Sequence, residues 1–90
     1  MAAALKAEAT RAWQAGDVPR ATVLFADALA LAQDSDVELR AKLHGNLFLC
    51  KKKGGLWLNA SLHAQSACEL LPTWPKAHAY LSEARCKLRL

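Results

Sequence analysis

Apolar residues recur every three or four positions along most of the chain, which is the spacing of one face of an α-helix. Two segments show the pattern most clearly: Val23, Leu24, Ala28 and Leu31, and then Leu39, Leu43, Leu47 and Cys50. Alanine, the strongest helix former, supplies much of the remaining apolar character, whereas β-branched residues are few. The pattern predicts an all-α protein.

Turn-forming residues divide this pattern into five predicted helices. The first helix should end at Gly16, the third at the Gly54-Gly55 pair and the fourth at Pro72, because glycine and proline commonly end helices. Together the five helices form one domain. We expect them over about residues 2–15, 18–33, 36–53, 56–71 and 74–89 of the 90-residue chain.

Capping residues mark three of the predicted helix starts. Asp17 is positioned to cap the second helix. Ser35 and Glu38 form a capping-box pattern at the start of the third helix. Thr73 is expected to cap the fifth helix, with Pro75 in its first turn.

Composition narrows the class of protein without naming a function. The formal net charge is +4, which is compatible with an acidic peptide or with nucleic acid as a partner. The three cysteines, Cys50, Cys68 and Cys86, form no CxxC pair and lie among leucine and alanine residues, so we expect buried thiols. With neither a secretory signal nor 18 consecutive apolar residues, we expect a soluble cytoplasmic protein that spans no membrane.

Candidates for catalysis or metal binding are sparse. The histidines, His44, His63 and His78, fall in no HExxH motif, and we expect them to form no close pair. The only run of glycines is the predicted turn at residues 54–55, so no phosphate-binding loop is expected. We therefore expect a protein that is not an enzyme and that holds no cofactor and no metal.

The predicted helices repeat in pairs. Ala21 and Ala60 follow the two intra-pair turns, and Ala28 and Ala67 come seven residues later, where small residues let helices cross closely. Residues 16–29 read Gly-Asp-x-x-x-Ala-x-x-x-Phe-x-x-Ala-Leu. This series resembles the tetratricopeptide repeat, which is a helix–turn–helix unit. A generic helical bundle is the alternative.

The resemblance covers the whole chain and implies a right-handed superhelical array. Two repeats would span about residues 2–34 and 36–72, followed by the first helix of a third repeat over about residues 74–89. The fifth helix would lack its usual partner, so its outer face is a candidate surface for self-association. The sequence departs from the family at Lys51, where an aromatic residue is usual, and at Gln33, where a proline is usual.

In tetratricopeptide domains the first helices of successive repeats line a concave groove, and the resemblance places a largely basic set of residues there. Such a groove suits an acidic peptide or a C-terminal carboxylate; an ordinary solvated face is the alternative. Within the set, Trp13 is the best candidate for an exposed aromatic contact. The predicted groove residues are Lys6, Thr10, Trp13, Gln14, Lys42, Asn46, Leu49, Lys52, Lys53, Lys76, Tyr80, Glu83 and Lys87.

Part of this set is similar to the carboxylate clamp of chaperone-binding tetratricopeptide domains. Lys6, Asn46 and Lys76 match three of the five clamp positions. Thr10 and Tyr80 replace the asparagine and arginine of the family, and a tyrosine hydroxyl donates one hydrogen bond where arginine donates two. The resemblance implies a partner with an acidic C-terminus, such as a heat-shock chaperone tail ending in Glu-Glu-Val-Asp.

Two classes of function therefore remain. The favoured one is an adaptor that binds an acidic or C-terminal peptide, and the other is a structural module that packs into a larger complex. Nucleic acid is a less favoured partner, because the three consecutive lysines at residues 51–53 match the helix dipole at a C-terminus. Trp57 and Trp74 are expected to serve packing.

Overall fold

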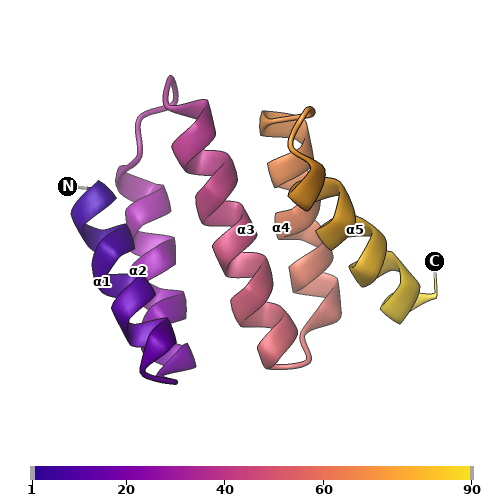
Figure 1. Cartoon of the computed structure of the whole chain (residues 1–90), viewed down its shortest axis with the longest axis horizontal. Helices are drawn as coiled ribbons and strands as arrows, with labels where there is room; N and C mark the ends of the chain where they lie inside the picture. Colours follow the sequence, from indigo (N-terminus) through magenta and orange to yellow (C-terminus); the bar gives the residue numbers. More distant parts are fainter. Residues whose placement is uncertain (1, 90) are drawn as a thin grey trace.

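Five α-helices make up the computed structural model, which describes residues 2–89 (Figure 1). This part of the chain contains no strand, so the prediction of an all-α protein with five helices is confirmed. None of the helices is long and apolar enough to cross a membrane. Their bounds are Ala2–Gln14 for α1, Val18–Leu31 for α2, Val37–Lys53 for α3, Trp57–Leu70 for α4 and Pro75–Leu88 for α5.

The starts of α2 and α3 are each capped by an aspartate. Asp17 caps α2 as predicted, and its side chain accepts a hydrogen bond from the backbone N–H of Arg20 at 3.3 Å. At α3 the cap is Asp36, which accepts from the backbone N–H of Leu39 at 3.2 Å. The predicted capping box starting at Ser35 is therefore wrong. The helix begins one residue later, where an ionised carboxylate also matches the helix dipole.

The start of α5 has no side-chain cap, so the predicted cap by Thr73 is also wrong. Trp74 occupies the cap position, and its backbone is extended with φ −87° and ψ 106°. Pro75 follows directly, and proline disfavours helical backbone at the residue before it. The proline, rather than a capping hydroxyl, therefore fixes where α5 begins.

Two glycines form the turns inside the helix pairs. Gly16 has a φ of 82° and Gly55 a φ of 75°, both in the left-handed region that glycine adopts without steric cost. These turns reverse the chain after α1 and after α3. As a result α1 with α2, and α3 with α4, form two helical hairpins in sequence (Figure 1).

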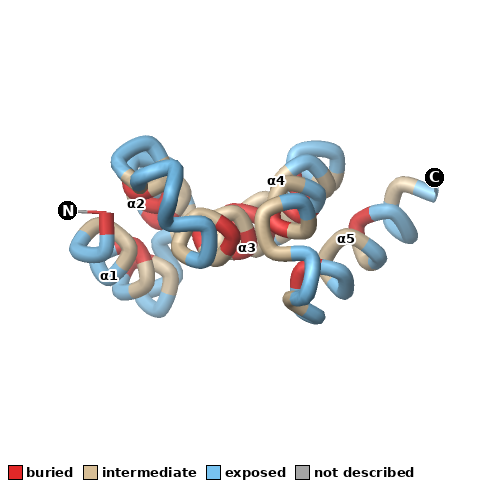
Figure 2. Tube along the Cα trace, turned by 90° about the horizontal axis from the view of Figure 1, so that it is seen from above, coloured by how far each residue is buried: buried red, intermediate tan, exposed pale blue. Residues whose placement is uncertain are grey.

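The central helix, α3, is packed on two sides. Leu43, Leu47 and Cys50 lie in a hydrophobic cluster with residues of α1 and α2. Phe48 lies in a second cluster with buried alanines of α4 and α5. Figure 2 shows the result: α2 and α4 lie on one side of α3, while α1 and the first half of α5 lie on the other. The molecule is a flat array of 37 × 30 × 17 Å.

Alanines lie where the helices approach closely. Ala21 and Ala28 of α2 and Ala60 and Ala67 of α4 are fully buried, as their repeated spacing predicted. A larger side chain at such a position would push the helices apart or force neighbouring side chains out of their preferred rotamers. The equivalent alanines therefore have equivalent packing roles in the two hairpins.

The buried face of α2 differs in part from the predicted one. Val23 and Leu31 belong to the predicted apolar face, but they are 59% and 57% exposed. The face that packs against the rest of the molecule consists of Ala21, Phe25 and Ala28. In an alanine-rich helix more than one face is apolar, so periodicity alone does not select the buried one.

Candidate functional site

A pocket of about 450 Å³ lies between α3 and α5 and brings together five of the predicted groove residues. It is called the α3–α5 pocket below. The predicted members are Lys42, Asn46, Leu49, Lys76 and Tyr80. Three further lining residues had not been predicted: Gly45, Trp74 and Pro75.

The aromatic wall of this pocket is built on a glycine of α3. Tyr80 stacks on Phe48 with ring centroids 4.5 Å apart, and Trp74 meets Tyr80 edge-on at 6.2 Å. Both are arrangements that aromatic pairs prefer. A Cβ atom at Gly45 would lie 2.9 Å from Cη2 of Trp74. The missing side chain at Gly45 therefore lets the Trp74 indole lie against α3.

Two lysines give the α3–α5 pocket its positive charge. The Lys42 Nζ lies 5.3 Å from the Trp74 ring centroid and 3.8 Å from Oε1 of Glu38, one turn earlier. Lys76, in the first turn of α5, is exposed. The described lining residues include no acidic side chain, so the pocket is suited to an anionic group.

Tyr80, which lines the pocket, also carries a hydrogen-bond donor, its hydroxyl group. Burial raises the pKa of this phenol; the nearby Lys52 lowers it and Glu83 raises it. The phenol is therefore protonated at neutral pH, since its ordinary pKa is already near 10. It can donate one hydrogen bond to an anion but carries no charge.

Two further hollows continue from the α3–α5 pocket. One of about 50 Å³ is lined by Thr10, Trp13, Phe25, Asn46 and Leu49. The other, of about 430 Å³, is lined by Trp13, Leu49, Lys52, Lys53 and Trp57. Leu49 lines all three spaces, and Asn46 and Trp13 each line two of them, so the three spaces adjoin one another along one face of α3, and we call them together the basic groove.

Three of the predicted groove residues on α1, of which Lys6 and Thr10 were also clamp candidates, contribute less to the α3–α5 pocket than expected. Lys6 lies outside the lining of the three spaces of the basic groove. Thr10 lines the small hollow, but its hydroxyl donates to the carbonyl oxygen of Lys6 at 2.9 Å, so its proton is used within α1. Gln14 lines a further hollow of about 180 Å³ near Gly16, which shares Trp13 and Lys53 with the basic groove.

Most of the remaining predicted residues form contacts between helices near the end of α3. Lys52 Nζ lies 2.7 Å from Oε2 of Glu83, an ion pair between α3 and α5. Lys87 Nζ lies 5.7 Å from the centroid of the Trp57 ring. Trp57 packs against the second hydrophobic cluster, as expected, and also lines the groove. Lys53 is exposed in the last turn of α3.

A histidine pair fastens α3 to α4 on the opposite face of α3. The Nδ1 atoms of His44 and His63 are 3.1 Å apart, and the ring centroids are 5.4 Å apart. One Nδ1 therefore donates a hydrogen bond and the other accepts it. The prediction that the histidines form no close pair is wrong, because the contact joins two helices and leaves no motif in the sequence.

The histidine pair is neutral at pH 7. Burial, with smaller contributions from His44 and Lys51, lowers the pKa of His63 to about 4. Burial also lowers the pKa of His44, and the Arg40 guanidinium adds to the effect. Both rings are half-buried, so protonating either one brings a charge into a region that already holds two cations.

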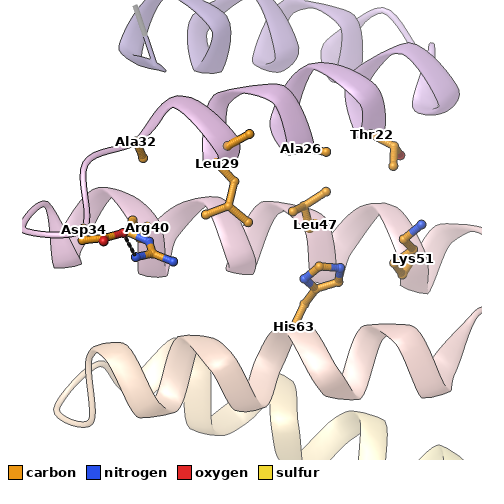
Figure 3. A pocket seen from close by; sticks show the side chains of 10 residues that line it. Thr22, Ala26, Leu29, Ala32, Asp34, Arg40, Leu47, Lys51 and His63 are labelled. Carbon is orange, nitrogen blue, oxygen red and sulfur yellow. Dashed lines mark hydrogen bonds and ion pairs between the residues drawn. The ribbon is translucent and has the colours of Figure 1, made fainter.

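A pocket of about 500 Å³ between α2 and α4 adjoins His63 (Figure 3). Leu29 and Leu47 line its middle, with Arg40 toward one end and Lys51 toward the other. Arg40 is already paired, since its Nη1 lies 3.0 Å from Oδ1 of Asp34. This pocket contains none of the predicted groove residues and lies on the other side of α3 from the basic groove.

The three thiols differ in exposure. Cys50 is buried as predicted, but Cys68 is half-buried and Cys86 is exposed, so the prediction is wrong for those two. Cys68 Sγ lies 3.8 Å from Nδ1 of His78, and His78 Nε2 lies 2.6 Å from the carbonyl oxygen of Pro72. Burial raises the pKa of the Cys68 thiol. Nowhere in residues 2–89 do three His, Cys, Asp or Glu side chains come together to hold a metal ion.

Comparison of the chain with protein-family models, with curated proteins and with solved structures gives no match. The assignment of a function therefore rests on the residues and the geometry described above.

Proposed function

We propose that the chain is a non-catalytic protein-interaction module of the tetratricopeptide type, with two repeats and the first helix of a third. The two hairpins support this proposal, because each carries buried alanines at corresponding positions: Ala21 and Ala28 in α2, Ala60 and Ala67 in α4. The packing of α5 on α4 follows that of α3 on α2, as a third unit would require.

The proposed activity is recognition of an acidic peptide through its C-terminal carboxylate in the basic groove. The α3–α5 pocket carries this proposal. It joins Asn46 with Lys76 and Tyr80 from a separate helix, adds Lys42, and has no acidic lining residue. An ordinary solvated lysine face would not need a hollow lined by hydrogen-bond donors from two helices.

The carboxylate would be held by charge and by directed donors. Lys42 and Lys76 supply the charge, while the Asn46 amide and the Tyr80 hydroxyl each donate a hydrogen bond. A hydrogen bond to a charged group contributes about 1.5–3 kcal/mol. Because the pocket is open to solvent and lacks an arginine fork, we expect an affinity of micromolar order.

The class of partner follows from the same chemistry. An acidic segment ending in a free carboxylate complements a basic groove. A heat-shock chaperone tail in the cytoplasm is one partner of this kind. In this proposal Lys42 takes the role that the clamp pattern assigned to Lys6, because Lys42 lines the pocket and Lys6 does not.

A second candidate function is that of a structural module in a larger complex. Leu58 and Leu62 lie one turn apart on α4 and are 63% and 55% exposed. None of the large apolar side chains exposed in residues 2–89 belongs to α5. Packing or self-association would therefore use the exposed apolar side chains of α4 and α2 rather than the outer face of α5.

A binding measurement tests the proposed activity. An acidic peptide labelled at its N-terminus is titrated with the protein by fluorescence polarisation, as the free acid and as the C-terminal amide. We expect the amide to bind about tenfold more weakly, because it loses a charge-assisted hydrogen bond. Equal binding of the two peptides would contradict the proposal.

Matched variants locate the site. Lys76→Glu should weaken binding of the free-acid peptide by about tenfold or more, because the substitution reverses a charge in the pocket. Lys51→Glu makes the same charge change on the opposite face of α3 and should have little effect. If both variants weaken binding equally, the attraction is general and the α3–α5 pocket is not the site.

A further inference from the structure

We propose that the α3–α5 pocket receives the whole C-terminal residue of the partner peptide, and that this residue has a large apolar or aromatic side chain. The inference rests on the proposed recognition of a C-terminal carboxylate and adds the side chain that accompanies it. Three features of the pocket support it: its volume, the apolar part of its lining and its small number of free cations.

The pocket is larger than a carboxylate requires. Its volume of about 450 Å³ equals that of about 15 water molecules at about 30 Å³ each. A carboxylate replaces only the water at its two oxygen atoms. Room therefore remains beside the carboxylate for a side chain of the size of leucine or phenylalanine.

Part of the pocket lining is apolar. This part consists of Leu49, Pro75 and the rings of Trp74 and Tyr80, and the rest of the lining is polar. Trp74 is fixed against α3 by the absence of a side chain at Gly45, and it meets Tyr80 edge-on. Aromatic and aliphatic side chains bind well against a rigid aromatic wall, because little freedom is lost on binding.

The cations of the pocket favour one carboxylate over two. Lys42 shares its charge with Glu38, 3.8 Å away, and with the Trp74 ring, so Lys76 supplies the larger part of the charge that the two lysines offer a carboxylate. Tyr80 adds a single donor and no charge. An aspartate as the last residue would bring a second carboxylate against Trp74 and Pro75, where desolvation disfavours it. Within this inference a chaperone tail ending in Glu-Glu-Val-Asp is therefore a weaker partner than an acidic peptide with an apolar last residue.

The test uses a set of acidic peptides that differ only in the last residue, which is phenylalanine, leucine, alanine or aspartate. Each is prepared as the free acid and as the C-terminal amide and titrated into the unaltered protein by calorimetry. We expect the phenylalanine and leucine acids to bind at least about fivefold more tightly than the alanine and aspartate acids. Each amide should bind about tenfold more weakly than its acid.

Two variants refine the assignment. Trp74→Ala should reduce the advantage of phenylalanine over alanine to less than about twofold while the acid-to-amide ratio persists. Leu58→Ala removes an exposed apolar side chain of α4 outside the basic groove and should preserve both ratios. Circular dichroism confirms that each variant is folded, and the peptide series on the unaltered protein is decisive without them.

The outcomes separate this inference from the proposed function. If the aspartate acid binds as tightly as the phenylalanine acid while both amides bind weakly, the inference is wrong and carboxylate recognition stands. If acid and amide bind alike for every last residue, carboxylate recognition is itself wrong, and the inference falls with it.

Discussion

The His44–His63 pair predicts that stability falls as the pH is lowered from 6.5 toward 4. Burial holds the pKa of His63 at about 4 in the folded state, below the ordinary value of 6.5. The unfolded chain therefore binds more protons than the folded chain between these values, so stability rises with pH in this window. The stabilisation is complete above pH 6.5 and is lost as the pH approaches 4.

The size of the effect follows from the pKa of His63. A fall from 6.5 to about 4 corresponds to at most about 3 kcal/mol, at 1.36 kcal/mol per pH unit. The ring is only half-buried, so solvent screening reduces this figure to about 1–2 kcal/mol. The neighbouring cations Arg40 and Lys51 favour the neutral pair, whereas Asp34 is exposed and already paired with Arg40.

The assay is urea unfolding followed by circular dichroism at several values of pH between 4 and 7.5. His63→Gln should remove most of the pH dependence that the histidine pair adds to the free energy of unfolding. His78→Gln changes an exposed histidine on α5 and should leave this pH dependence intact. If the unaltered protein and His63→Gln lose the same free energy of unfolding between pH 7 and pH 4.5, the reasoning is refuted.

Three further predictions concern single substitutions. Ala21→Leu should destabilise the protein by about 1–3 kcal/mol in thermal melts, because it overpacks a close helix crossing, whereas Ala26→Leu at an exposed position of α2 should change little. Asp36→Ala should lower the free energy of unfolding by about 0.5–2 kcal/mol through loss of the α3 cap, and Ser35→Ala should lower it much less. A larger loss for Ser35→Ala than for Asp36→Ala would instead support the predicted capping box at Ser35. Tyr80→Arg should tighten binding of acidic peptides by supplying a bidentate donor, and unchanged affinity in calorimetry would place the carboxylate elsewhere.

Local sequence features were sufficient to predict the helices. Gly16, the Gly54-Gly55 pair and Pro72 punctuate the chain strongly, and the observed helix ends lie within two residues of the predicted ones. Asp17 capped α2 as expected because a cap depends on residues only three positions apart. Two neighbouring capping residues were harder to tell apart from sequence, and Asp36 rather than Ser35 caps α3.

Contacts between helices were predictable only where a repeat made them so. The alanines at equivalent positions of α2 and α4 were identified as crossing points, and all are buried. The contact between His44 and His63 has no such repeat, and the exposure of Val23 depends on which apolar face of α2 packs inward. Trp74 lines the α3–α5 pocket only because Gly45 gives it room, a relation between two helices that neither residue reveals alone.

The most direct test of the central claim is to locate the bound peptide by nuclear magnetic resonance. The acidic free-acid peptide is added to isotope-labelled protein, and the side-chain amide of Asn46 and the indole N–H of Trp74 are followed. The account predicts that both signals shift, together with backbone signals around Lys76, and that Lys76→Glu suppresses the shifts. Shifts confined to α4 around Leu58 and Leu62 would contradict peptide recognition in the basic groove and support a structural module instead.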